Sequence, residues 1–509
     1  MALLALCLAS EFFFLGDRAP LQKYRRNFVL LASFLIPFYF YWLTLAPGIA
    51  GDDSAEYALQ AHRLKLAHGG GYPFYLALGK IFTKIFSFAF DYSIIFSMNL
   101  MSAFFSAASI GLLSWIGMHT GVHPRWALFT SLQLAFTSVF WSQATFTEVT
   151  NVAVALQLLM IAQSLGNTHR SPQILQPVKN PPHLFFFFFA ACSVGFYSPI
   201  LAFLPTAFLL YRNLGFSRKP QDSTIFFWRL LCYALGFCLV AWITCHHARI
   251  EPGLGTRAPP TDLFKLLQNY FGFEEGGFQI SDGTFGMARS LKFFGDSILV
   301  SLGIFIPFTV LGFNQLRRSG FTDLAWALLS IIFLQGLVFY ASGANLPVIR
   351  SNLSHAAMFL LIGHGLQSLI ESQKIHHVFQ KLIIGIPAIT LFISMQNPLA
   401  QLKANNPYVT KVDRHDLQIF EKTVRLIFRK LPPHSVIFAE WPIMTGIRYH
   451  QHLEKIRPDI LAFESRDHMW YQKTFIKDYL KAACFFEKSR PVYFYRMTDQ
   501  QLDKQKPCS

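Results

Sequence analysis

Three carboxylates and a histidine lie close together in one short stretch of the chain. The segment Gly51-Asp52-Asp53-Ser54-Ala55-Glu56 is followed by His68 and Tyr72. A carboxylate here could act as a general base toward an incoming hydroxyl, or could orient a phosphate-bearing substrate through a metal ion. Because acidic side chains are costly near hydrocarbon, they are functional candidates when they occur beside an apolar span. This stretch is therefore predicted to carry chemistry.

The same residues also admit a structural interpretation. Asp52 or Ser54 could cap a helix that starts near Glu56, and the spacing alone favours neither interpretation. The glycines 69–71 could allow close approach of the backbone to a substrate, or could form a flexible turn. The segment 72–88 is apolar with two interspersed lysines, which indicates an amphipathic helix lying in the membrane interface.

A second polar stretch, Trp141–Glu148, interrupts apolar sequence further along the chain. A tryptophan such as Trp141 is common at a membrane interface and needs no further explanation. Glu148 has no such anchoring role. It fits either a substrate contact or a negative charge at the start of a helix.

The composition shows which elements must position these groups. Of the 509 residues, 53% are hydrophobic and only 14% are charged, against roughly a quarter charged in soluble domains. Several apolar runs reach the roughly 20 residues that a helix needs to cross a bilayer. The chain is therefore predicted to be an all-α polytopic membrane protein.

Charge and cysteine usage exclude two other classes. The net charge is +16, but in a membrane protein excess Lys and Arg first mark cytoplasmic loops, so no nucleic-acid partner is expected. The seven cysteines include no C-x-x-C pair and no histidine at zinc spacing, so neither a zinc cluster nor a disulfide framework is expected.

Hydropathy and charge together predict a topology. The first span runs from about Phe28 to Ala46, and the basic residues before it place the N-terminus in the cytoplasm. Both polar stretches then fall outside. The run 184–211 is predicted to be a hairpin of two half-length helices broken at Ser198-Pro199, because proline disfavours helix at the residue before it. About ten or eleven membrane helices result, the further spans being 94–117, 126–143, 149–165, 226–246, 292–313, 323–341, 354–372 and 381–397.

The sequence changes character after about residue 397, where charged residues become interspersed with short apolar runs. Strands are expected at 435–439, 459–463 and 489–495. A membrane domain over 1–397 is therefore predicted to precede a small soluble α/β domain over 398–509, which lies on the outer side.

The polar motifs resemble those of a known family. The matching stretches are Thr44-Leu-Ala-Pro47, Gly51-Asp-Asp-Ser-Ala-Glu-Tyr57, Ala67-His-Gly-Gly-Gly-Tyr-Pro-Phe74, and Phe140-Trp-Ser-Gln-Ala144 with Glu148-Val149. They are similar to the GT-C superfamily of polytopic glycosyltransferases, specifically the transmembrane-protein-260-like protein O-mannosyltransferases. Weaker similarity continues into the C-terminal part.

Several positions depart from the family pattern. The departures are Asp52 and Ala55 in place of two glycines, Gly69 and Gly70 in place of Pro-Pro, Thr150 in place of Tyr, and Tyr197-Ser198-Pro199 in place of a polar Asn-His pair. The Asp, Glu and His of the first outer loop remain intact.

The resemblance implies a GT-C-like fold and transfer, on the outer or lumenal face, of a sugar from a polyprenyl-phosphate donor to a hydroxyl of a protein, lipid or glycan, with inversion. Carried over residue by residue, Asp53 is the candidate catalytic base. Its substrate-binding or orienting neighbours would be Asp52, Glu56, His68, Tyr72 and Glu148. Arg350 could meet a lipid phosphate at a span end, although a snorkelling arginine would occupy the same position.

Other interpretations and properties stay open at this point. No cofactor and no metal ligand is assigned, and a role for a divalent metal is left open. A transporter or flippase of a lipid-linked or amphipathic substrate is the alternative function, and a noncatalytic scaffold is a third. The expected location is the bacterial inner membrane, or the ER membrane if the source is eukaryotic.

Overall fold

The structure is a computed structural model, and part of the chain is described here. The described residues are 22–50, 53–68, 71–166, 188, 191–192, 195, 222–250, 262–270, 303–342, 352–371, 414–464, 490–496 and 501–504. The hairpin predicted around Ser198-Pro199, the span 381–397, Asp52 and Arg350 lie outside them. So does the predicted domain boundary at residue 397, which stays a prediction.

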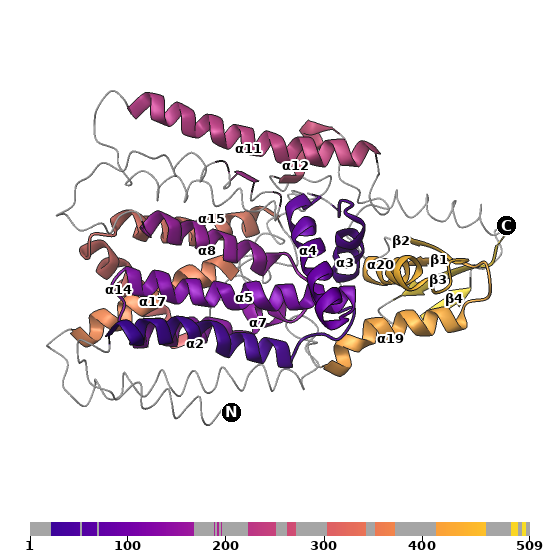
Figure 1. Ribbon diagram of the computed structural model, residues 1–509, viewed down its shortest axis with the longest axis horizontal. Coiled ribbons are helices and arrows are strands. Elements are labelled where there is room, and N and C mark those ends of the chain that lie inside the picture. Colours follow the sequence, from indigo (N-terminus) through magenta and orange to yellow (C-terminus); the bar gives the residue numbers. More distant parts are fainter. Residues whose placement is uncertain are drawn as a thin grey trace.

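A bundle of long apolar helices forms the larger part of the described structure (Figure 1). Its first half contains α2 (Gln22–Leu43), α5 (Ile94–His119), α6 (Pro124–Ala135), α7 (Ser138–Ala144) and α8 (Thr150–Gly166). Helix α5 lies at the centre and packs against α2, α6, α7 and α8. A single apolar cluster that includes Tyr41, Ile110 and Phe136 joins these helices.

The predicted span 126–143 is two helices rather than one. Helix α6 ends at Ala135 and α7 begins at Ser138. Thr137 forms the break, because its hydroxyl accepts a hydrogen bond from the Phe140 N–H at 3.4 Å and so caps α7. Neither piece alone has the length to cross a bilayer.

The second half of the bundle contains α11 (Asp222–Ile250), α12 (Leu263–Tyr270), the 3₁₀ turn η5 (Gly303–Phe305), α14 (Ile306–Arg318), α15 (Thr322–Ser342) and α17 (Asn352–Glu371). Helices α14 and α17 cross at very short range. A Cβ on Gly312 would lie 1.7 Å from the Leu361 carbonyl oxygen, and one on Gly365 would lie 2.1 Å from that of Phe308. Such small-residue crossings are typical of packed membrane helices.

Serine side chains link three of the bundle helices. Ser33 of α2 lies 2.6 Å from Ser114 of α5, and Ser114 donates to Ser131 of α6 at 2.8 Å. All three are buried. Hydrogen bonds of this kind hold helices together where no hydrophobic driving force acts between them.

Within the described part of the chain, five helices are long and apolar enough to cross a membrane: Arg25–Leu43, Pro73–Phe90, Ile94–His119, Leu231–Arg249 and Asn352–Glu371. The protein is therefore an integral membrane protein, as predicted. The full number of membrane helices and the orientation of the N-terminus stay predictions.

Two helices lie at the end of the bundle that faces the C-terminal part of the chain: α3 (Ser54–Arg63) and α4 (Pro73–Phe90) (Figure 1). By length and composition α4 could span, yet Figure 1 draws it across the bundle end. Its exposed face carries Ile81, Ile85 and Phe88 beside the two lysines. The interfacial position expected for 72–88 stays a prediction.

The C-terminal part contains a four-stranded sheet with helices beside it. Its elements are α19 (Arg414–Lys430), β1 (Val436–Ala439), α20 (Trp441–Tyr449), the π-helical turn η6 (His450–Glu454), β2 (Leu461–Glu464), β3 (Val492–Arg496) and β4 (Gln501–Lys504). The strand order is β2-β1-β3-β4. Strand β1 is parallel to β2 and β3, with Val436 opposite Leu461 and Val492, whereas β4 is antiparallel to β3.

The three expected strands are present at their predicted positions, and β4 is an addition. Strand β1 is buried along its whole length, as a central parallel strand must be. An apolar core that includes Val424, Ile437 and Met444 joins α19, β1 and α20. Helix α20 follows β1 directly. The carboxyl end of β1 therefore determines where Trp441, the first residue of α20, lies.

Candidate functional site

The loop that follows α2 leads into α3 at Asp53, and the start of this helix bears on the capping interpretation of the segment. Asp53 occupies the N-cap position, but its side chain makes no capping hydrogen bond. Its backbone carbonyl accepts from the Tyr57 N–H at 2.9 Å. Ser54 is the first helical residue rather than the cap, and its hydroxyl accepts from the Ala50 N–H at 3.3 Å. The carboxylate of Asp53 is thus directed to other partners.

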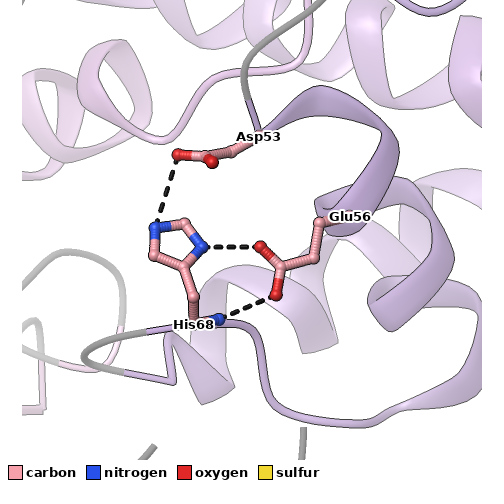
Figure 2. Close-up of side chains that lie close together, drawn as sticks. All are labelled: Asp53, Glu56 and His68. Atoms are coloured by element: carbon pink, nitrogen blue, oxygen red, sulfur yellow. Dashed lines mark hydrogen bonds and ion pairs between the residues drawn. The ribbon is translucent and has the colours of Figure 1, made fainter. Parts of the chain in front are cut away.

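Those partners form a chain of polar contacts, Asp53–His68–Glu56 (Figure 2). The Oδ2 atom of Asp53 lies 3.4 Å from Nε2 of His68. The other ring nitrogen, Nδ1, lies 2.5 Å from Oε2 of Glu56, and the His68 backbone N–H donates to Glu56 Oε1 at 2.9 Å. The two carboxylates therefore hold the imidazole ring from opposite sides.

Glu56 is the buried member of this chain. It is 0% exposed, whereas the Asp53 side chain is 25% exposed. Burial raises the pKa of Glu56, and the charge and hydrogen bonds of His68 oppose part of that rise. Nδ1 of His68 faces Glu56, and Nε2 faces Asp53. Glu56 thus orients His68, and Asp53 is the more exposed of the two carboxylates.

Aromatic rings enclose the imidazole. Tyr57 stacks on His68 with ring centroids 5.8 Å apart, and Tyr72 meets it edge-on at 5.9 Å. Tyr57 also contacts Tyr72 and Tyr75. Burial raises the pKa of Tyr57 well above 10, and the charges of Tyr72, Asp53 and Glu148 add to the effect. Tyr57 is therefore a neutral hydroxyl in the middle of the cluster.

Sequence reasoning missed Tyr57 as a site residue. The sequence did hold a sign of its importance, because Tyr57 follows Glu56 directly in the family-like motif Gly51–Tyr57. On a helix, however, adjacent residues point in different directions, so the spacing did not favour its contact with His68.

Glu148 lies at the start of α8 and close to the acidic residues of α3; a substrate contact stays a prediction. It lies two residues before α8, and its Oε1 accepts from the Thr150 hydroxyl at 3.2 Å, which fits a negative charge at a helix start. Its backbone N–H donates to Ser102 of α5 at 3.1 Å. Because its charge acts on Tyr57, Glu148 also belongs electrostatically to the region of the acidic cluster.

A residue from the far end of the chain enters the same site. The indole N–H of Trp441 donates to Oδ1 of Asp53 at 2.7 Å, and its ring meets His68 edge-on at 5.6 Å. No pattern in the sequence placed Trp441 there, since 387 residues separate the two positions.

The donor atoms of Asp53, Glu56 and His68 all lie within 4.8 Å of one another. Oxygen and nitrogen donors at this spacing could bind a divalent cation. The Glu56 carboxylate and the His68 Nδ1 atom already bond to each other, however, so these two groups are satisfied without a metal. A role for a metal stays open.

The structure thus brings together four of the predicted site residues, Asp53, Glu56, His68 and Tyr72, with Glu148 nearby. The other two, Asp52 and Arg350, lie outside the described residues.

The fold belongs to a recognisable class of membrane protein. ArnT from Cupriavidus metallidurans bound to undecaprenyl phosphate aligns with a TM-score of 0.54 and 12% identity, over 92% of this chain and 93% of that chain. The apo form aligns with a TM-score of 0.51 and 12% identity over 93% of each chain. These likenesses confirm the GT-C-like fold expected from the sequence.

The particular family is indicated by sequence. Residues 53–220 match the family model described as "Protein O-mannosyl-transferase TMEM260 N-terminal domain". Proteins named protein O-mannosyl-transferase TMEM260 are 21% identical over 460 residues in Mus musculus and 20% identical over 489 residues in Dictyostelium discoideum. The matches cover 84% and 85% of this chain but 62% and 57% of those relatives. The expected resemblance to the TMEM260-like family is confirmed, and the chain spans about three fifths of the length of these relatives.

Proposed function

We propose that this protein is a membrane glycosyltransferase that moves a sugar from a polyprenyl-phosphate donor to an acceptor hydroxyl, with Asp53 as the base. The observation that carries the proposal is the Asp53 carboxylate, partly exposed at the end of the bundle and held by His68 on one oxygen and Trp441 on the other. A base must be both reachable and oriented, and Asp53 meets both conditions.

The proposed reaction balances around a single proton transfer. Asp53 takes the proton of the acceptor hydroxyl while the acceptor oxygen forms a bond to the anomeric carbon of the sugar. The bond from that carbon to the phosphate oxygen breaks, and the polyprenyl phosphate leaves with the electron pair. Attack opposite the leaving group inverts the anomeric centre.

The neighbouring residues would have supporting roles. Glu56 orients His68, and His68 fixes one oxygen of Asp53. Stabilising the charge on the departing phosphate needs a cation or hydrogen-bond donors. Arg63 and Lys65, at the end of α3, are candidates among the described residues, and Arg350 is a further candidate from the sequence.

Relatives and neighbours suggest the substrates with which to begin. ArnT is a structural neighbour with undecaprenyl phosphate bound, which supports a polyprenyl-phosphate donor. The relatives are named protein O-mannosyl-transferases, which favours mannose as the sugar and a protein hydroxyl as the acceptor.

The test is sugar transfer by the purified protein in lipid, with radiolabelled polyprenyl-phosphate sugars as donors, mannose first, and cell extract as acceptor. Asp53→Asn is expected to lower transfer at least roughly hundredfold, as loss of a general base does, while folding and membrane insertion are unchanged. Asp91→Asn is the matched control. Asp91 is an exposed residue at the C-cap of α4 with φ of 55°, a conformation that Asn tolerates.

Two results would contradict the proposal. Full activity of Asp53→Asn would show that Asp53 is not the base. Absence of transfer from every donor by folded wild-type protein would favour the transporter or flippase alternative, which a vesicle uptake assay would then address. The position of the acidic cluster at the end of the bundle, rather than between its helices, supports a transferase.

A further inference from the structure

The candidate base has polar partners from two parts of the chain that are far apart in sequence. His68, from the first outer loop, approaches Oδ2 of Asp53, and Trp441, from the C-terminal part, donates to Oδ1. The family model that matches this chain covers residues 53–220 and so does not reach Trp441. The second of these contacts is thus a feature of this chain's tertiary structure.

Apolar packing determines the position of Trp441. Helix α20 packs against α3, the helix that carries Glu56 and Tyr57 (Figure 1). Tyr449, at the other end of α20, belongs to the same apolar cluster as Tyr57 and Ile49. Trp441 itself is buried. Its contact with Asp53 is therefore part of a packed interface and not a chance approach of two surface side chains.

Close approach at the middle of α20 fixes the interface further. A Cβ on Gly446 would lie 3.0 Å from Val424 of α19 and 3.9 Å from Ile49 of the first outer segment. Ile49 thus lies close to the backbone of α20 at this glycine. Helix α20 thus contacts the first outer loop at three positions. Trp441 and Tyr449 do so at its two ends, and Gly446 does so between them.

The chemistry of the indole group limits what Trp441 can do. An indole nitrogen is a donor only, and it neither accepts nor releases a proton under ordinary conditions. It cannot act as acid or base toward a substrate. A 2.7 Å hydrogen bond to a carboxylate is a short, charge-assisted contact, which restricts the rotation of the carboxylate.

We infer that Trp441 is a positioning residue for Asp53, so that the C-terminal part of the chain completes the site formed by the first outer loop. This inference rests on the proposed function for its kinetic consequences. The contact itself can be tested without any activity.

The kinetic test uses Trp441→Phe, which keeps an aromatic ring and removes the N–H. We expect kcat to fall roughly tenfold to hundredfold, the range of a hydrogen bond to a charged group, while KM for the polyprenyl-phosphate mannose donor changes less than about twofold, since Trp441 is assigned no contact with the donor. Tyr493→Phe in β3 is the matched control, because it also removes one polar atom from an aromatic ring of the C-terminal part. It is expected to keep wild-type kinetics.

The second test is a double-mutant cycle on thermal stability, which needs no substrate. Trp441→Phe and Asp53→Ala each remove the hydrogen bond, so the Tm loss of the double variant is expected to be smaller than the sum of the two single losses. Additive losses would show that the contact does not form and would overturn the inference.

The outcomes separate the inference from the proposed function. Wild-type kcat in Trp441→Phe, from protein that does transfer sugar, would overturn the positioning role and leave the proposed function standing. A roughly tenfold to hundredfold rise of KM with unchanged kcat would also overturn the positioning role, since that result would indicate that Trp441 binds the donor. If the wild type transfers nothing, the proposed function fails, and the stability cycle still decides whether Trp441 holds Asp53.

Discussion

The two walls of the candidate site are built by different means. The first wall, formed by Asp53, Glu56 and His68, comes from sixteen consecutive positions and is held by polar contacts among those residues. The second wall, formed by Trp441, Gly446 and Tyr449 of α20, is held by apolar packing against α3 and Ile49. The first wall supplies the carboxylate proposed as the base, and the second contributes a hydrogen bond to it.

This difference shows how one site can be assembled from residues that are close and residues that are distant in sequence. Polar contacts between near neighbours cost little chain entropy to bring together, because the loop between them is short. A contact across 387 residues must be stabilised by other means, and burial of apolar area is the main one available. Substitutions on the first wall should therefore lower mainly activity, and substitutions in the packing of the second wall should lower both stability and activity.

Among substitutions that leave Asp53 in place, the largest effect is expected on the first wall, from Glu56→Gln. The change keeps the shape of the side chain but removes the charge that faces His68 Nδ1, so His68 no longer has one fixed orientation. We expect kcat for sugar transfer to fall roughly hundredfold, within the range found when acid–base groups lose their alignment. Glu371→Gln, at an exposed position of α17, is the control. Unchanged kinetics in Glu56→Gln would show that the orientation of His68 does not matter.

An intermediate effect is expected on the second wall, from Gly446→Val. Its branched side chain has no room beside Val424 and Ile49, and α20 must shift away from α3. We expect a lower Tm together with a roughly tenfold loss of kcat, since the Trp441 hydrogen bond is lost with the shift. Gly446→Ala is the graded comparison. Its Cβ at 3.0 Å requires only a small adjustment, and alanine favours helix, so near-normal activity is expected. If valine is tolerated as well as alanine, the second wall is not closely packed.

The smallest effect concerns the C-terminal part away from the site. Hydrogen bonds from Arg457 hold the pKa of Asp459 well below its usual 3.8. A depressed pKa stabilises the fold at pH values above about 3.8, and this stabilisation is lost as the pH falls through the folded-state pKa. Asp459→Asn should thus lower Tm at pH 7, by on the order of 2 °C because both partners are partly exposed.

The matching measurement compares melting curves of wild type and Asp459→Asn at pH 7 and at pH 3. The difference in Tm is expected to shrink at pH 3, and sugar transfer at pH 7 is expected to be unchanged, because Asp459 does not touch either wall. A difference that grows on acidification would mean that the Arg457 contact does not stabilise the fold.

Much of the first wall could be predicted from the sequence. Asp53, Glu56, His68 and Tyr72 were all expected to serve one site, and the structure places them together. Spacing alone could not decide which of the two carboxylates is buried and which is exposed. Burial of Glu56 and exposure of Asp53 follow from which face of α3 packs on the bundle, and that face is set by residues elsewhere.

In the bundle and the sheet, too, single elements could be predicted from the sequence, whereas their packing could not. Hydropathy located α5, α8 and α17 within about two residues and placed the start of α2 six residues late, and short apolar runs located β1, β2 and β3. The break between α6 and α7 was missed, because a continuous apolar run hides the capping threonine, Thr137, within it. The place of α20 against α3 was also beyond prediction, since it depends on packing between parts distant in sequence.

The sequence by itself determined that the protein crosses a membrane, that it resembles the TMEM260-like family, and that the loop after its first span carries acidic groups close to a histidine. These features depend on composition and on spacing within short windows, which the chain encodes locally. The tertiary structure decided that Glu56 holds His68, that Asp53 remains partly open, and that Trp441 reaches it from the C-terminal part. Those contacts depend on how apolar faces of separate helices pack together, and no local window of sequence records that outcome.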